Sequence, residues 1–128
     1  MAITYFCPSC WNTLEGEEDR CPNCGYVLAD FNQLPYEDKL VLALQHPVRD
    51  TRYVVAEILG KITSLKALPE FERFLDDAET DYYMLRTIVD ALEKIEGPES
   101  LNLLEKAGRH HNMLIQERAR RMLEKRKT

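Results

Sequence analysis

The sequence predicts a mostly α-helical protein, in which a short right-handed α-solenoid of helix pairs follows a small β segment built around four cysteines. Two observations support this prediction. All four cysteines of the 128-residue chain fall within its first quarter, as two matched Cys-Pro-x-Cys pairs. From Pro35 onward, apolar residues recur at helical spacing, and the pattern repeats with the length of a helix pair. We therefore expect the β segment at 1–30, a linker at 31–35 and a helical repeat domain at 36–128.

The four cysteines are Cys7, Cys10, Cys21 and Cys24, in the spacing C-x2-C-x10-C-x2-C. Each pair places two thiols on a tight turn, so both sulfur atoms can reach one ion. The connection between the pairs is long enough for a short hairpin with its tip near 14–17. Four thiolates complete a tetrahedral shell, the closed arrangement of structural zinc sites, and leave no open position for catalysis. The spacing predicts one structural Zn²⁺ held by these residues.

The segment from about residue 4 to residue 30 resembles the zinc-ribbon family, through the two Cys-Pro-x-Cys knuckles and Gly25 after the last cysteine. The resemblance implies a small β fold in which both knuckles hold a single zinc ion. Trp11 departs from the family, because it stands where the first knuckle often carries glycine. The departure concerns the geometry of the first turn, whereas the four ligands match the family's pattern.

Three other uses of the cysteines stay open. A pair of disulfides would suit a secreted mini-domain, but residues 1–5 show neither the basic nor the apolar part of a signal peptide. Rubredoxin-type iron sites use similar knuckles, but these lie further apart in the chain and are flanked by a larger aromatic core. A thioredoxin-like redox pair expects one Cys-x-x-Cys in a βαβ context, which this sequence lacks. Zinc is the ion that the spacing favours.

Charge is distributed unevenly along the chain. Residues 1–35 carry five acids and one base, a net charge of −4, and four thiolates on one Zn²⁺ would make this segment more negative. Residues 36–108 have a net charge of −6 and residues 109–128 one of +5. Phosphate binding needs clustered Lys and Arg, and residues 1–35 offer Arg20 alone. Nucleic-acid binding through this segment is therefore disfavoured.

The composition also bears on location. No apolar run approaches the ~18–20 residues that span a bilayer, so the sequence predicts a protein that does not cross a membrane. Charged residues make up 30% of the chain, as expected for solvated helices. Because reduced, metal-held cysteines fit the cytosol, we expect a cytoplasmic location.

Six helices with short connections are expected after residue 35. Ser64 is the predicted N-cap of the third helix, Thr80 or Asp81 that of the fourth, and Asn112 that of the sixth. Pro69 falls early in the third helix, where at most one hydrogen bond is lost. The helices are expected at 36–45, 51–62, 65–75, a fourth that includes 84–95, 99–107 and a last one through 123.

Apolar residues mark the side of each helix that faces the core. Together with the absence of a strand pattern after residue 35, they predict an all-α array. The expected inward positions are Val54, Val55, Ile58, Leu59 and Ile62 in the second helix, Leu65, Leu68, Phe71, Phe74 and Leu75 in the third, and Met84, Leu85, Ile88, Val89, Leu92 and Ile95 in the fourth.

The helical region repeats itself. A shift of 33 residues places apolar positions of the second and third helices on those of the fourth and fifth, and a shift of 31 places the first helix on the third. The stretch 52–62 resembles HEAT repeats of the short, phycobilisome-lyase-like kind, with matches at Arg52, Leu59 and Gly60. In the next unit Leu85 and Glu93 replace the family's arginine and glycine. The resemblance implies a half-repeat, two full repeats and a final half.

An array this short leaves one flank of its first helix uncovered, since roughly three or more repeats are usually needed for stability. We expect the zinc ribbon to cover this flank as an N-terminal cap. The alternative, an independent ribbon on a short tether, stays open. The side chains that the ribbon offers for the contact are Tyr5, Phe6, Trp11, Tyr26, Leu28 and Phe31.

No catalytic constellation and no small-molecule site emerge from the sequence, so we expect a protein that is not an enzyme. His46 lies at a helix end, and His110 and His111 are adjacent, so these two cannot share a helix face. The acidic clusters at 15–19 and 76–81 lie in predicted turns, where solvated carboxylates are more common than pairs arranged for acid–base chemistry.

Solenoids of helix pairs usually bind partners on the concave surface that the second helix of each pair lines. This architecture predicts a non-catalytic interaction or adaptor protein, whose protein partner the sequence does not identify. On the expected surface, the repeat offsets align Leu42, Arg73 and Lys106 in one row, and Gln45, Asp76 and Arg109 in the neighbouring row.

A basic run in the last helix supports an alternative function. Basic residues near a helix C-terminus stabilise the helix by about 0.3–1 kcal/mol each, and six within ten residues exceed that need. A contact with an acidic protein surface or with nucleic acid, centred on Arg120 and Arg121, is therefore the second hypothesis. The run comprises Arg118, Arg120, Arg121, Lys125, Arg126 and Lys127.

Overall fold

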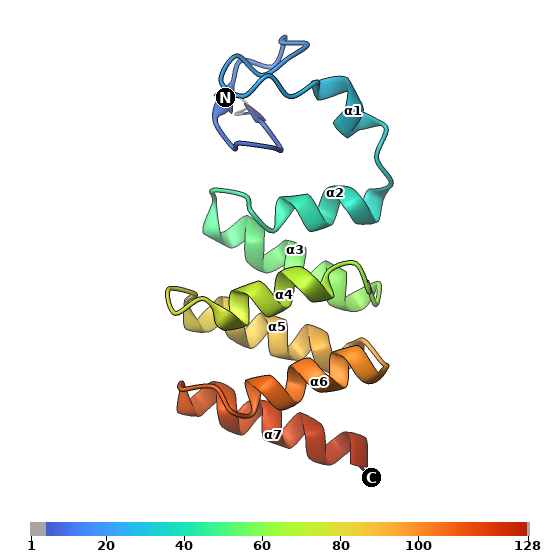
Figure 1. Ribbon diagram of the computed structural model, residues 1–128, viewed down its shortest axis with the longest axis vertical. Coiled ribbons are helices and arrows are strands. Elements are labelled where there is room, and N and C mark those ends of the chain that lie inside the picture. The colour runs from blue at the N-terminus through green and yellow to red at the C-terminus, as the bar shows by residue number, and fades with distance from the viewer. Residues whose placement is uncertain (1–4, 128) are drawn as a thin grey trace.

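A computed structural model describes residues 5–127 and shows an elongated molecule (Figure 1). The part that holds the four cysteines, residues 5–27 (the cysteine segment), lies at one end. Residues 1–4 of the predicted β segment, Thr128 and the side chain of Lys127 lie outside this description. The strands are β1 (Tyr5–Phe6) and β2 (Thr13–Leu14), and the helices are α1 (Leu28–Asn32), α2 (Tyr36–Ala43), α3 (Arg49–Lys61), α4 (Leu68–Asp76), α5 (Tyr82–Lys94), α6 (Pro98–Ala107) and α7 (Met113–Lys127).

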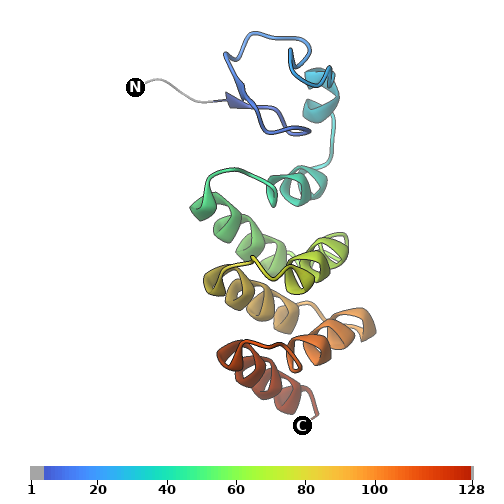
Figure 2. The ribbon, with the colours of Figure 1, turned by 60° about the vertical axis from the view of Figure 1, so that its left-hand side comes forward.

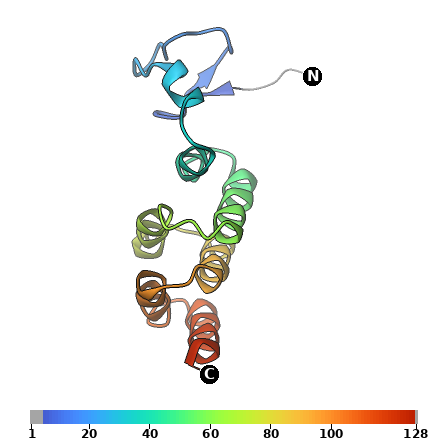
Figure 3. The same cartoon turned by 90° about the vertical axis from the view of Figure 1, so that its right-hand side faces the viewer.

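The helices from α2 onward form two layers. Figure 3 shows α2, α4 and α6 stacked in one layer, and α3, α5 and α7 stacked in the other. Each helix of one layer is joined by a short turn to a helix of the other, so the chain winds back and forth between the layers. The architecture is a solenoid of helix pairs preceded by a small two-stranded sheet, as the sequence predicts.

The cysteine segment folds around two separate turns. β1 pairs antiparallel with β2, with Tyr5 opposite Leu14, so the two strands flank the first cysteine pair. An isolated bridge between Arg20 and Val27 flanks the second pair. The predicted hairpin between the two pairs is not formed within residues 5–127. A turn does follow Leu14, and there the carboxylate of Glu18 accepts three consecutive backbone N–H groups.

Helix α1 lies across the boundary between the predicted β segment and the predicted linker. The backbone N–H of Leu28 donates to the carbonyl of Asp19 at 3.0 Å, which ties the start of α1 to the cysteine segment. Near its end, the Lys39 ammonium of α2 lies 5.5 Å from the centroid of the Phe31 ring. The described residues therefore hold seven helices rather than the six expected, because part of the predicted linker is helical.

Side-chain caps fix the beginnings of two helices at the predicted residues. Asp81 Oδ2 accepts the backbone N–H of Met84 at 3.2 Å at the start of α5. Asn112 Oδ1 accepts the N–H groups of Leu114 and Ile115 at the start of α7. Both bonds satisfy backbone donors that have no partner within the helix.

The predicted cap of the third helix is wrong. α4 begins at Leu68 after a turn, and its N-cap residue is Ala67, which offers no side-chain acceptor. The buried Ser64 hydroxyl instead donates to the carboxylate of Glu37 in α2 at 2.7 Å. Ser64 therefore ties α2 to the α3–α4 turn. Pro69 lies in the first turn of α4, where the missing N–H has no helical partner.

The core lies between the two layers, and α5 is its centre. All six predicted inward residues from Met84 to Ile95 are buried, because α5 packs against both α3 and α7 within its layer. The stripes predicted for the second and third helices are too wide. Val54, Ile62 and Leu65 are 54%, 43% and 59% exposed, respectively. None of the helices within residues 5–127 combines the length and apolar character needed to cross a bilayer.

The turns between the layers repeat one hydrogen bond. The side chains of His46, Asp77 and His110 each accept the backbone N–H of the residue two positions later, at 2.9–3.0 Å. These three residues are 31 and 33 positions apart, which are the offsets that the apolar pattern predicts. The repeat is therefore present in the turns as well as in the core.

Candidate metal centre and partner surface

The four cysteine side chains converge on one point. Their Sγ atoms all lie within 4.8 Å of one another. Cys7 and Cys24 are 3.6 Å apart between sulfur atoms, and so are Cys10 and Cys21. Zn–S bonds of ~2.3 Å in a tetrahedron require sulfur–sulfur distances of about 3.8 Å, whereas a disulfide requires about 2.05 Å. These four residues can therefore hold one tetrahedral metal ion.

The two knuckles share one backbone geometry. In each, the N–H of the first cysteine donates to the carbonyl five residues later, and the N–H four residues later returns to that cysteine's carbonyl. This turn places Trp11 at φ 65° and Gly25 at φ 79°, both in the left-handed region. The first knuckle thus keeps the geometry expected for glycine, although a left-handed backbone costs a non-glycine residue about 1–2 kcal/mol.

Backbone amides point at the sulfur atoms. The N–H groups of Ser9 and Asn23 lie 3.4 Å from the Sγ atoms of Cys7 and Cys21, the two buried ligand candidates. Hydrogen bonds of this kind favour the thiolate over the thiol. The thiolate is the form of cysteine that binds a metal, so the peptide backbone prepares the site for a cation.

Hydrogen bonds, desolvation and neighbouring sulfur atoms give the two outer thiols, Cys10 and Cys24, different pKa values. The backbone amide of Asn12 lowers the pKa of Cys10 to about 6. The backbone amide of Tyr26 favours the thiolate of Cys24, but desolvation and the three neighbouring sulfur atoms raise the pKa of Cys24 to about 11. Four thiolates this close repel one another unless a cation compensates them, and a divalent metal ion supplies that charge.

The cysteine segment contacts the helices through His46, in the turn after α2. The His46 ring lies edge-on to Phe6 and to Trp11, with centroids 4.9 and 5.3 Å apart. Its Nδ1 accepts the N–H of Val48, which fixes the ring. Burial and the nearby Arg52 lower the pKa of His46, so the ring is neutral at pH 7. Figure 2 shows the cysteine segment above α2 at this end of the solenoid.

This contact is narrower than the sequence predicts. The buried side chains around the cysteines and those between the helices form two separate clusters within residues 5–127. Of the six ribbon side chains expected to make the contact, Phe6 and Trp11 meet His46, Phe31 meets Lys39, Tyr26 and Leu28 pack on the cysteine cluster, and Tyr5 packs beside Gly16.

A groove of about 450 Å³ lies between the cysteine segment and the helices α2 and α4, and His46 is not part of its lining. Trp11 and Tyr26 line one wall, and Leu42 and Arg73 line the other. The structure thus brings two of the six predicted partner-binding residues, Leu42 and Arg73, into one groove. The rows of residues that the repeat offsets align did not predict the aromatic wall, because no repeat offset relates the ribbon to the helices.

Ion pairs cross-link the predicted rows on α4 and α6. Lys106 Nζ lies 2.6 Å from an Asp76 oxygen and 3.5 Å from a Glu72 oxygen, and these contacts raise the pKa of Lys106. Arg73 pairs with Glu70 at 3.2 Å within α4. The remaining predicted residue, Arg109, is exposed in the turn after α6. Within this layer, α4 and α6 therefore present charged side chains that ion pairs link from one helix to the next.

The basic run of α7 is partly engaged within the chain. Arg118 makes a two-point contact with Asp90 of α5, at 2.7 and 2.9 Å, which raises the pKa of Arg118. Arg120 Nε donates to the carbonyl of Gly108 at 3.2 Å. Arg121 is exposed and pairs with Glu117, one turn earlier, at 3.8 Å. Of the two residues expected to contact nucleic acid, Arg120 is thus also a structural contact.

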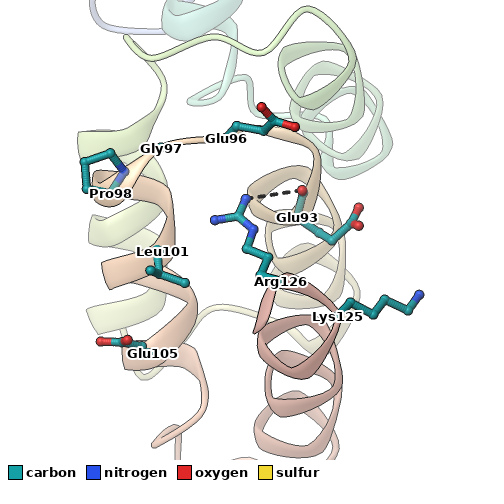
Figure 4. Close-up of a pocket in the computed structure, with 8 residues that line it drawn as sticks. All are labelled: Glu93, Glu96, Gly97, Pro98, Leu101, Glu105, Lys125 and Arg126. Atoms are coloured by element: carbon teal, nitrogen blue, oxygen red, sulfur yellow. Dashed lines mark hydrogen bonds between the residues drawn. The ribbon is translucent and has the colours of Figure 1, made fainter. Parts of the chain in front are cut away.

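Arg126 closes the C-terminal end of α5. Its Nη2 donates to the carbonyls of Leu92, Glu93 and Ile95, and to the Ser100 hydroxyl. Figure 4 shows Arg126 reaching toward Glu93 at the edge of a hollow of about 660 Å³ between α5, α6 and α7. Sequence reasoning assigned Arg126 to a binding run, because the spacing within α7 carries no sign of this distant contact.

Comparison with known proteins gives one match. The sequence model of the family described as HEAT repeats matches residues 37–124, which include α2 to α6 and most of α7. A search of curated proteins and a search of solved structures found no match. The matched region begins after the cysteine segment, so the family match covers the solenoid and does not include the four cysteines.

Proposed function

Since the chain belongs to the HEAT-repeat family, we propose that it is a non-catalytic adaptor that binds a protein partner through the layer of α2, α4 and α6. The observation that carries the proposal is the ion-paired surface of α4 and α6 in this layer, where contacts such as Lys106–Asp76 hold charged side chains of neighbouring helices in a fixed arrangement. A rigid, extended face of this kind suits recognition of another protein. Reduced cysteines at a metal are consistent with a cytoplasmic location.

The metal centre has a structural role in this proposal. One Zn²⁺ on Cys7, Cys10, Cys21 and Cys24 folds residues 1–30 as a zinc ribbon, and residues 31–35 join it to the helical domain at 36–128. The sulfur–sulfur distances support a tetrahedral ion, and the spacing of the cysteines favours zinc over iron. The contacts at His46 support a ribbon that caps the N-terminal end of the solenoid.

The subtype of the repeats is part of the proposal. The stretch 52–62, with Arg52, Leu59 and Gly60, supports short repeats of the phycobilisome-lyase-like kind. In the structure Gly60 lies against Ala91 of α5, so the glycine serves close packing of α3 on α5. The proposal carries over the helix packing of that subtype, and no catalytic activity.

Affinity purification of the zinc-loaded full chain from a native extract, with and without nuclease, tests the proposed function. A stoichiometric protein partner that survives nuclease supports it. A double variant at the end of α6 and in the turn after it, Lys106→Ala with Arg109→Glu (the α6 variant), is expected to lose this partner, because both side chains belong to the proposed binding surface. The matched control on α7, Arg120→Glu with Arg121→Glu, is expected to retain it.

The opposite pattern would overturn the proposal in favour of the second hypothesis. If nuclease released everything that the full chain retains, and the α7 variant alone lost binding, nucleic acid would be the partner. The intramolecular contacts of Arg118, Arg120 and Arg126 argue against this outcome, since each contact occupies donors that phosphate would need.

A further inference from the structure

The groove between the cysteine segment and the helices is built from parts that lie far apart in the sequence. Pro8, Trp11 and Tyr26 come from the two knuckles, whereas Leu42 comes from α2 and Arg73 from α4. The groove therefore exists only while the knuckles are folded and seated against α2. Its volume of about 450 Å³ is in the range of sites that bind small ligands and side chains.

The aromatic wall of the groove rests on an unusual backbone. Trp11 adopts the left-handed conformation that Gly25 adopts at the equivalent position of the second knuckle. Glycine would avoid the cost of this conformation, so the indole must contribute something that glycine cannot. One edge-on contact, with His46, holds the ribbon. The indole also lines the groove, opposite the half-buried Leu42.

The charges around the groove favour a cationic occupant. The lining holds one base, Arg73, and one acid, Glu70, which pair at 3.2 Å, so the lining itself has no net charge. The excess negative charge beside the groove comes from the cysteine segment. Pro8 and Ser9 of the lining lie between two ligand candidates of the metal centre. Four thiolates on one Zn²⁺ leave a charge of −2 there, and residues 1–35 add a net −4.

From this geometry we propose that the groove binds a short basic peptide segment of the partner protein. A bulky apolar side chain of the peptide lies between Trp11 and Leu42, and flanking Lys or Arg side chains lie beside Glu70 and the thiolate centre. The apolar contact supplies most of the affinity, and the charges supply orientation and salt dependence. This inference rests on the proposed adaptor function and on the metal centre, and adds the chemical class of the ligand.

Trp11 provides the assay, since it is the single tryptophan of the chain. The zinc-loaded full chain is titrated with the blocked pentapeptide Lys-Lys-Leu-Lys-Lys while indole emission is recorded. We expect a saturable change that weakens with added salt. The peptide with glycine at its centre and the peptide with four glutamates as flanks are expected to bind at least tenfold more weakly.

Two variants and one control locate the site. Glu70→Gln removes the acidic group and Leu42→Ala removes the apolar wall, and each is expected to weaken the pentapeptide at least fivefold. Leu65→Ala changes an exposed leucine outside the groove and is expected to leave binding unchanged. Circular dichroism of each variant establishes that its helices are intact before it is titrated.

Several results would overturn the inference. These are an absent or non-saturable response, equal responses to the three peptides, or full binding by both groove variants. A response to oligouridylate in place of the pentapeptide, or emission that changes with protein concentration alone, would assign the groove to nucleic acid or to a second copy of the chain. If the peptide fails while the α6 variant still loses its protein partner, the groove assignment is wrong and the proposed adaptor function stands.

Discussion

A close approach of α3 and α5 gives a prediction whose sign and size follow from the structure. Gly60 of α3 faces Ala91 of α5. A Cβ atom added to Gly60 would lie 2.7 Å from Ala91 Cα and 2.8 Å from Ala91 Cβ. Carbon atoms in contact normally lie about 3.5–4.0 Å apart, so the two helices would have to separate by about 1 Å. The Gly60→Ala substitution therefore has two opposing effects on stability. Alanine stabilises the helix, and the added Cβ disturbs the packing of α3 on α5.

The two effects have different magnitudes. Replacing glycine by alanine inside a helix stabilises that helix by about 1 kcal/mol. Overpacking a well-packed core costs about 1–3 kcal/mol, and the upper end applies here because backbone rather than a flexible side chain must move. Leu59 of α3 and Ile88 of α5 are buried in the same core and lose contacts when α3 shifts. We expect Gly60→Ala to lower the free energy of unfolding by about 2 kcal/mol.

Urea unfolding followed by far-ultraviolet circular dichroism measures this change. A loss of about 2 kcal/mol moves the midpoint down by about 1 M, for a slope of about 2 kcal/mol per M. Ala91→Gly in the same chain removes the atom at 2.8 Å and is expected to recover part of the loss. Gly108→Ala is the matched control, since an added Cβ would approach no atom closer than 3.3 Å, the distance to the Glu105 carbonyl oxygen. A gain of about 1 kcal/mol by Gly60→Ala would refute the packing argument.

Three further predictions concern the ends of the solenoid. Arg126→Ala leaves the carbonyls of Glu93 and Ile95 without their side-chain donor, whereas the carbonyl of Leu92 keeps the Ser100 hydroxyl. We expect a fall of about 1.5–3 kcal/mol in the free energy of unfolding in urea, and an unchanged value would exclude this role. Trp11→Gly relieves about 1–2 kcal/mol of backbone strain but removes the ring from His46. We expect one metal ion per chain to remain bound while amide hydrogen exchange in α2 becomes faster, and equal exchange would contradict the contact. Burial lowers the pKa of His110, so its contribution to stability is full above about pH 6.5 and is lost as the pH falls through its folded-state pKa. His110→Asn, which can still accept the Asn112 N–H, is expected to flatten the pH profile of unfolding in that range, and identical profiles would contradict this.

Local patterns in the sequence predict much of this fold. The spacing of the cysteines predicts that four thiols meet, because each pair lies within a single turn of chain. That they bind zinc stays a prediction. All six residues that helical spacing predicts to face inward around α5 are buried, since neighbours cover α5 on both sides, but the buried Ala91 was not predicted. The spacing overstates the buried side of α3, where Val54 stays exposed. Asp81 and Asn112 are predictable caps because the bonds that they make are local.

Contacts between distant segments explain the errors. Ser64 has the residue type and place of an N-cap, but Glu37, 27 positions earlier, receives its hydrogen bond. Arg126 resembles a binding residue in a basic run, but it closes α5 more than 30 positions away. The groove at Trp11 combines two regions that no repeat offset relates. In each case the tertiary structure brings the residue to a partner far away in the sequence. The local sequence pattern around the residue does not reveal that partner.

Thermal unfolding of the helices with and without the metal shows whether a metal-held ribbon seated on His46 caps the solenoid. We expect one Zn²⁺ per chain, and a fall of at least about 4 °C in the helical unfolding temperature when a chelator removes it. This corresponds to the loss of about 1 kcal/mol of aromatic contacts at His46. A chain that binds zinc but whose helices unfold at the same temperature after its removal would contradict this capping role.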